Sequence, residues 1–129
     1  MLGKFILWLS TIAFVGYGIA CLLSPDLPAR NAGLVVSGGD GYAELGAMYG
    51  GLQTGFGLLC LLGAVRADFY RPVLTMLVVV IGLLALGRAY SMVMGPGGYG
   101  AYSYLALGYE VFTAVVAALA LRSVKAVST

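Results

Sequence analysis

The chain has 129 residues, of which 61% are hydrophobic and only 9% carry a charge, and its mean hydropathy is +1.00. A soluble domain of this size carries about 25% charged residues, so the composition excludes a water-soluble globular protein and predicts an integral membrane protein. The net charge of +2 is small and scattered along the chain, and we therefore expect no nucleic-acid partner.

Hydropathy predicts four transmembrane helices in a single domain that covers residues 1–129. The expected spans are residues 2–23, 42–65, 72–94 and 101–121, each near the length of about 20 residues that a bilayer requires. The first span stops at Ser24-Pro25, and Pro72 opens the third at a favoured first-turn position. In the connection that follows the first span, an apolar stretch at residues 34–36 is expected at the membrane surface. The fold class expected is all-α, an antiparallel four-helix bundle.

The basic residues predict the orientation of the bundle, because cytoplasmic loops carry an excess of Lys and Arg. With four alternating spans, one side of the membrane receives Lys4, Arg66, Arg71, Arg122 and Lys125. The opposite side receives only Arg30, which has Asp26 and Asp40 for neighbours. We therefore expect both termini in the cytoplasm, and a multi-pass protein of the inner (cytoplasmic) membrane.

The residue types give no support to metal or cofactor chemistry. His is absent from the chain, which removes a common ligand of zinc and haem. Cys21 lies near the outer end of the first span and Cys60 near the inner end of the second, almost a membrane apart in depth. Disulfide geometry forbids a bond over that separation. We expect no metal, no cofactor and no disulfide.

Small residues predict which helix faces meet other helices. Gly46 and Gly50 form one small-xxx-small pair in the second span, and Gly51 and Gly55 form another on a different face. Glycine at this spacing lets helix backbones approach closely, so we expect the second span to be the most enclosed, with both pairs at helix contacts. The fourth span carries a small, slightly polar stripe that we also expect to face protein: Ser103, Ala106, Glu110, Thr113, Ala114 and Ala117.

Two charged residues lie within the expected spans. Glu110 is near the middle of the fourth and Arg88 is in the outer part of the third, where a charge costs roughly 3 kcal/mol on insertion scales and usually pairs or lines a cavity. Arg88 lies roughly 10 Å, Glu110 roughly 13 Å and Gln53 roughly 16 Å below the outer surface, at the helical rise of 1.5 Å per residue. Side chains lean toward the N-terminus of their helix, so these three converge on one layer. The predicted ligand site is Arg88, Glu110 and Gln53, with Tyr49 one turn from Gln53.

Other interpretations of the same residues stand beside this one. Arg88 and Glu110 would also suit a purely structural buried ion pair, or Arg88 would extend to the outer interface. Glu44, close to the start of the second span, is explained by the favourable placement of an acid near a helix N-terminus. Its membership in the site is left open.

Several short motifs follow one another at fixed spacing: Glu44-Leu-x-x-x-Tyr49-Gly50-Gly51, then Gly87-Arg88-x-x-Ser91, then Glu110. Together they resemble the uncharacterised bacterial membrane family known as domain of unknown function 4345. The resemblance covers most of the chain and extends to its length and number of spans. It implies a four-helix membrane bundle in a bacterium, and it implies no activity.

Three functions fit these residues, in the following order. The first is a binding or accessory protein that holds a lipid-soluble molecule or a partner's helix at the Arg88–Glu110 layer. The second is a membrane enzyme that performs isomerisation, epoxide opening or cyclisation on an apolar substrate, with Glu110 or Glu44 as the acid–base group. The third is a proton-coupled transporter that uses Glu110. The expected partners are the lipid bilayer, an apolar small molecule, and either another membrane protein or a second copy of the chain.

Overall fold

The computed structural model describes residues 1–123, which are helical almost throughout and contain no strand. The predicted all-helical class is confirmed for these residues, and Lys125 lies outside them. The chain divides into two compact units. Unit 1 comprises residues 1–7 and the chain from Gly63 onward, and unit 2 comprises residues 8–62. Within residues 1–123, four helices are long and apolar enough to cross a membrane: Leu2–Leu23, Gly38–Val65, Ala67–Met94 and Ala101–Ser123.

The first and last of these helices agree closely with the sequence-based boundaries. Helix α1 is Leu2–Leu23, as expected, and α7 is Ala101–Ser123, which ends just beyond the predicted Leu121. The loop before α7, residues 95–100, contains four of the chain's glycines. Gly97 and Gly98 have positive φ angles of 83° and 76°, a region that L-residues with side chains rarely enter, so the loop reverses the chain within a few residues.

The two middle helices begin earlier than predicted, and each contains a π-helical stretch. Helix α3 (Gly38–Leu45) continues through the π-helical stretch Gly46–Gly51 into α4 (Leu52–Val65). Asp40, rather than Glu44, is therefore the acid in the first turn. A π-helical turn holds more residues than an α-turn, so the face of a residue in this helix does not follow from a strict 3.6-residue period.

The third long helix consists of α5 (Ala67–Met76), the π-helical stretch Leu77–Ile81 and α6 (Gly82–Met94). The expected first-turn position of Pro72 is wrong, because Pro72 lies inside α5, beyond the first turn. The break with α4 is a single residue, Arg66, whose extended backbone (φ −117°, ψ 124°) is incompatible with a continuous helix.

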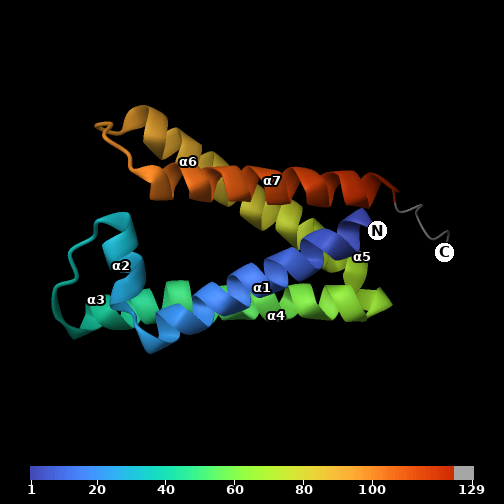
Figure 1. Ribbon diagram of the computed structural model, residues 1–129, viewed down its shortest axis with the longest axis horizontal. Coiled ribbons are helices and arrows are strands. Elements are labelled where there is room, and N and C mark those ends of the chain that lie inside the picture. Colours follow the sequence, from blue (N-terminus) through green and yellow to red (C-terminus); the bar gives the residue numbers. More distant parts are fainter. Residues whose placement is uncertain (124–129) are drawn as a thin grey trace. The chain divides into compact units, whose positions relative to one another are not determined.

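In unit 1, α7 packs along the whole of the third long helix, and Figure 1 shows α6 and α7 side by side with the loop that joins them. The buried side chains of the third helix are mostly aliphatic: Val73, Leu74, Leu77, Ile81 and Ala85. On α7 the predicted stripe faces protein, since Glu110, Thr113 and Ala117 are buried. Helix contact is therefore made through the small and polar face of α7.

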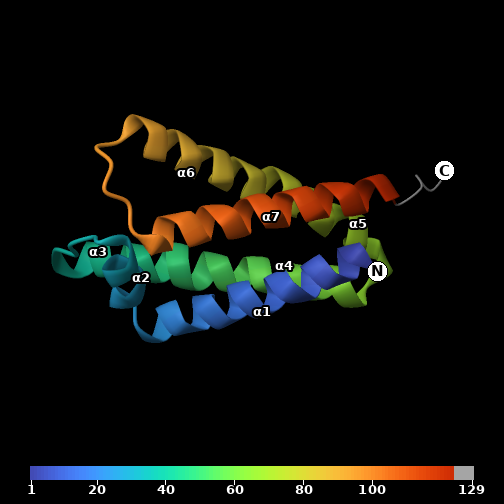
Figure 2. The same cartoon turned by 45° about the horizontal axis from the view of Figure 1, so that its top comes forward.

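Unit 2 is built around close backbone approach between α1 and the second long helix, which run beside each other in Figure 2. A Cβ atom on Gly18 of α1 would lie 2.6 Å from the backbone nitrogen of Thr54 and 3.0 Å from the carbonyl oxygen of Gly50. A Cβ on Gly57 would lie 2.7 Å from the backbone nitrogen of Val15. Only glycine permits this separation, so Gly18, Gly50 and Gly57 define the interface.

Within unit 2, the expectation that both glycine pairs of the second span make helix contacts is wrong for one pair. Gly50 packs on Leu22, but a Cβ added to Gly51 or Gly55 would have no neighbouring atom within 4 Å. The spacing of Gly51 and Gly55 shows that another helix could approach closely, but it does not require that a helix is packed against them. The second span is also not the most enclosed. In the most apolar 18-residue stretch of each helix, 39% is buried in α1 and 28% in Gly38–Val65.

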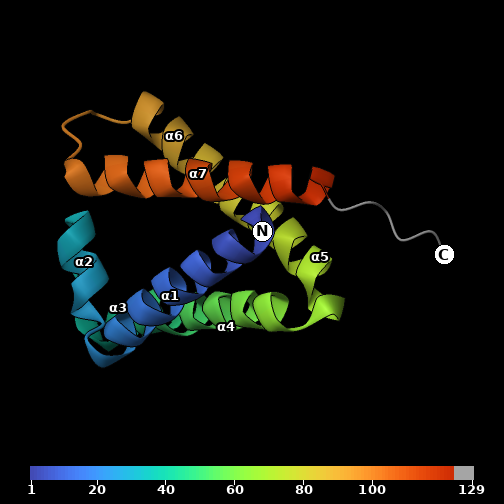
Figure 3. The ribbon, with the colours of Figure 1, turned by 45° about the vertical axis from the view of Figure 1, so that its right-hand side comes forward.

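A short helix, α2 (Asp26–Ala32), was not predicted and occupies the first connection, where it packs on α3 (Figure 3). Asp26 and Arg30 form an ion pair of 2.8 Å one turn apart, and Gly33 ends the helix with a left-handed φ of 69°. Both are common features of helix stabilisation and termination. The apolar stretch at residues 34–36 follows as non-helical chain.

We expect the substitution Gly18→Ala to destabilise the protein by about 1–3 kcal/mol, because the new methyl group is forced against the backbone of the neighbouring helix. The matched control is Gly16→Ala on the same helix, where an added Cβ meets no atom within 4 Å. Thermal unfolding of both variants in detergent compares them directly. A Gly18→Ala variant as stable as Gly16→Ala would contradict the assigned interface.

Candidate functional site

The central feature of the candidate site is a buried ion pair between α6 and α7. The Nη2 atom of Arg88 donates to Oε1 of Glu110 at 2.7 Å, and Nε donates to Oε2 at 2.9 Å and to Oε1 at 3.1 Å. This bidentate arrangement is the strongest geometry available to an Arg–carboxylate pair. The predicted proximity of the two side chains is confirmed.

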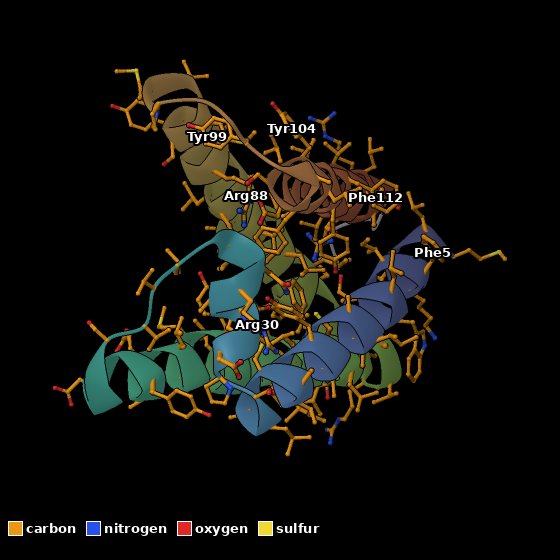
Figure 4. The ribbon with its side chains drawn as sticks, turned by 60° about the vertical axis from the view of Figure 1, so that its left-hand side comes forward. Phe5, Arg30, Arg88, Tyr99, Tyr104 and Phe112 are labelled. Carbon is orange, nitrogen blue, oxygen red and sulfur yellow. The ribbon has the colours of Figure 1, made fainter. Side chains whose placement is uncertain are left out.

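Burial of the pair is unequal between its two members. The side chain of Glu110 is 6% exposed, whereas that of Arg88 is 25% exposed. Arg88 is held by Glu110 through these bonds, so the interpretation in which it extends to the interface is wrong for this structure. Figure 4 shows Arg88 between α6 and α7, with Tyr99 in the loop that joins them. The carboxylate is enclosed, and the guanidinium is the accessible member of the pair.

Arg88 lines an open hollow of about 400 Å³ on unit 1, here named the Arg88 hollow. Its other polar residues are Ser91 of α6, Tyr99 of the loop and Ser103 of α7. The Tyr99 hydroxyl donates to the backbone carbonyl of Ser91 at 3.1 Å and so fastens the loop to the end of α6. This path of the loop requires glycine at position 95, since a Cβ there would lie 2.7 Å from the Ser91 carbonyl oxygen.

The remaining wall of the Arg88 hollow is apolar. Leu83, Leu84 and Met92 line it together with Gly87, where an added Cβ would have no atom within 4 Å. Hydroxyl and guanidinium donors thus stand beside aliphatic side chains, within a volume that falls in the range of small-molecule sites. The arrangement suits a ligand with an oxygen-bearing head group and a hydrocarbon body.

Sequence reasoning did not assign Ser91, Tyr99 or Ser103 to the site. Ser91 follows Arg88 by three residues, which places the two on one helix face. This spacing could have indicated that Ser91 lies beside Arg88 in the site. Tyr99 lies in a glycine-rich loop without periodicity, and its position depends on the backbone path of that loop. Hydropathy contains no information on such a path.

The other predicted site residues belong to unit 2, whereas the ion pair belongs to unit 1. Gln53 on α4 and Tyr49 in the π-helical stretch are half-buried, and Glu44 on α3 is exposed. Their membership in a ligand site with Arg88 and Glu110 stays a prediction, as do the acid–base roles considered for Glu110 and Glu44. Among residues 1–123, no group of three or more His, Cys, Asp or Glu side chains is placed to hold a metal ion.

We expect Glu110→Gln to destabilise the protein by about 3–5 kcal/mol, because it leaves the Arg88 guanidinium partly buried without its counter-ion. The control is Glu44→Gln, which changes an exposed carboxylate. The double variant Arg88→Met/Glu110→Leu removes both charges and should recover much of the loss. Thermal unfolding in detergent gives the comparison, and equal stability of Glu110→Gln and the wild type would show that the pair contributes nothing.

The comparisons with known proteins identify a family without an assigned activity. The family described as "Domain of unknown function (DUF4345)" matches residues 2–121. No significant match was found to a curated protein or to a solved structure. The match spans nearly the whole chain, the residues that line the Arg88 hollow and both members of the ion pair included, and the chain belongs to the DUF4345 family.

Proposed function

We propose that the chain is a four-span membrane protein with both termini in the cytoplasm. The four long helices are strongly apolar, and each has at least 22 residues. Those lengths meet the requirement of a bilayer. Lys4, Arg66, Arg71 and Arg122 then lie on the cytoplasmic side, with Arg30 alone on the other. A bacterial inner membrane is the proposed location.

The topology is tested by labelling single cysteines with a membrane-impermeant maleimide in a background that carries Cys21→Ala and Cys60→Ala. We expect Gly100→Cys, in the α6–α7 loop, to react in intact cells. Asp68→Cys, at the start of α5, should react only in inverted vesicles or after permeabilisation. Labelling of both positions from the same side would contradict the proposal that the helix between them crosses the membrane.

We further propose that the protein binds a lipid-soluble molecule in the Arg88 hollow. The observation that carries this proposal is the position of Arg88, which pairs with the enclosed Glu110 and also lines the hollow. The pair is neutral as a whole, so it provides directed hydrogen-bond donors in an apolar setting without a net charge. Ligand oxygen atoms that accept hydrogen bonds are therefore the proposed contact with Arg88, Ser91 and Ser103.

Binding is favoured over acid–base catalysis by the arrangement of Glu110. Both of its oxygen atoms accept hydrogen bonds from Arg88, and its side chain is 6% exposed. A general acid or base must come within hydrogen-bond reach of the reacting group, and the carboxylate is turned to Arg88 instead. The role proposed for Glu110 is to orient the guanidinium.

Gly87 offers a way to fill the hollow without disturbing the ion pair. An added side chain at Gly87 starts in open space and projects from a residue of the hollow wall. The matched control is Gly108 on α7, which also has open space around it and is not among the lining residues. We expect Gly87→Leu and Gly108→Leu to have the same thermal stability as the wild type.

The probe is palmitic acid carrying a diazirine in its chain, photolysed with the purified protein in detergent, together with its uncharged methyl ester. In the wild type, labelling should map to α6 peptides that contain residues 83–92, and Gly87→Leu should lose most of it while Gly108→Leu keeps it. Equal labelling of both variants would overturn the assignment of the hollow. Labelling by the acid but not by the ester would show that a full negative charge is required.

A further inference from the structure

A second hollow, of about 350 Å³, lies on unit 1 where the first residues of α1 meet the α4–α5 turn. Its polar wall consists of Lys4, Arg66 and Tyr70, and we name it the Lys4 hollow. Met1, Ala64 and Val65 form part of its apolar wall. It shares no residue with the Arg88 hollow, and the function proposed above makes no use of it.

The Lys4 hollow carries an excess of positive charge. In the described part of unit 1 the acids are Asp68 and Glu110, and Glu110 is bonded to Arg88. Asp68 lies 3.5 Å from the guanidinium of Arg66, with its side chain 81% exposed. A solvent-exposed pair of this kind is weak, so Asp68 offsets only part of the positive charge of Lys4 and Arg66.

The structure also orients two of the polar side chains in the wall of the Lys4 hollow. The guanidinium carbon of Arg66 lies 5.9 Å from the centre of the Phe69 ring, a cation–π distance that restrains the side chain. The Tyr70 ring packs directly on Gly3, where a Cβ would lie 2.8 Å from the ring carbon Cζ. The absence of a side chain at Gly3 therefore sets the place of the Tyr70 hydroxyl at the wall of the hollow.

We propose that the Lys4 hollow binds the phosphate head group of an anionic phospholipid. Lys and Arg are the usual partners of phosphate oxygens, and basic pockets between spanning helices on the cytoplasmic side are suited to anionic lipid head groups. Val65 at the end of α4 is 60% exposed and provides an apolar surface for the acyl chains. The inference rests on the proposed membrane insertion and orientation, and it is independent of ligand binding at the Arg88 hollow.

The test measures the binding of phosphatidylglycerol to the full chain in a neutral detergent, by native mass spectrometry and by the increase in thermal stability. Phosphatidylcholine is the control lipid, since it has the phosphate group and no net charge. We expect Lys4→Gln/Arg66→Gln to weaken phosphatidylglycerol binding by roughly 30-fold, from about 1 kcal/mol for each basic residue. Arg122→Gln removes a basic residue of unit 1 that does not line the hollow, and it should bind as the wild type does.

Asp68→Asn provides a variant in which binding should improve. Without the carboxylate near Arg66, the affinity for phosphatidylglycerol should rise by roughly 5-fold, a gain that a loss of folding cannot produce. Four results would each overturn the proposal. They are equal binding of the two lipids, an equal loss of binding in Arg122→Gln, no gain in Asp68→Asn, and complete competition by millimolar inorganic phosphate, which would identify free phosphate as the ligand.

Discussion

The bidentate bond between Arg88 and Glu110 is the constraint on which the arrangement of α6 and α7 depends. Three donor–acceptor distances between 2.7 and 3.1 Å require the two helices to keep one register, because a shift of a single residue would move the groups 1.5 Å apart along the axis. Gly82 and Ala114 lie on the same interface, with 3.8 Å between a Cβ placed on Gly82 and that of Ala114. The ion pair selects the register, and the small residues allow the close approach that the register needs.

Much of this arrangement follows from the sequence, because the positions of Arg88 and Glu110 are set by simple physical quantities. The helical rise per residue predicts a similar depth for both residues. Helical side chains lean toward the N-terminus of their helix, which directs the two side chains toward one another. Because a buried charge is costly, each of them needs an oppositely charged partner. The Arg88 hollow could not be predicted from the sequence in this way. Its volume depends on where Tyr99 is fastened to Ser91, and that bond is made by a loop whose path is set by Gly95, Gly97 and Gly98.

Where the sequence-based expectations differ from the structure, three physical reasons can be named. A π-helical stretch at Gly46–Gly51 adds residues to a turn of the second long helix, so its faces do not follow from an unbroken 3.6-residue period. A small-xxx-small pattern shows that a neighbouring helix could approach closely, but it does not show that a helix is packed there. Gly50 contacts Leu22, for example, while Gly51 has open space beside it. Helix α2 was missed because its 7 residues are too few for a hydropathy signal, and its ion pair between Asp26 and Arg30 is a local, solvent-exposed feature.

The ion pair also has a consequence for how the protein is made. Arg88 and Glu110 are 22 residues apart, and only residues 95–100 separate their helices. In the proposed membrane topology, the helix that carries Arg88 emerges before its counter-ion during synthesis, and entering the bilayer alone would cost it roughly 3 kcal/mol. If the two helices insert together as a hairpin, the charge is already neutralised when it leaves water. Because the α6–α7 loop is so short, this pairing can form as soon as α7 is complete, so the proposed topology would make the hairpin the unit of membrane insertion for the C-terminal half of the chain.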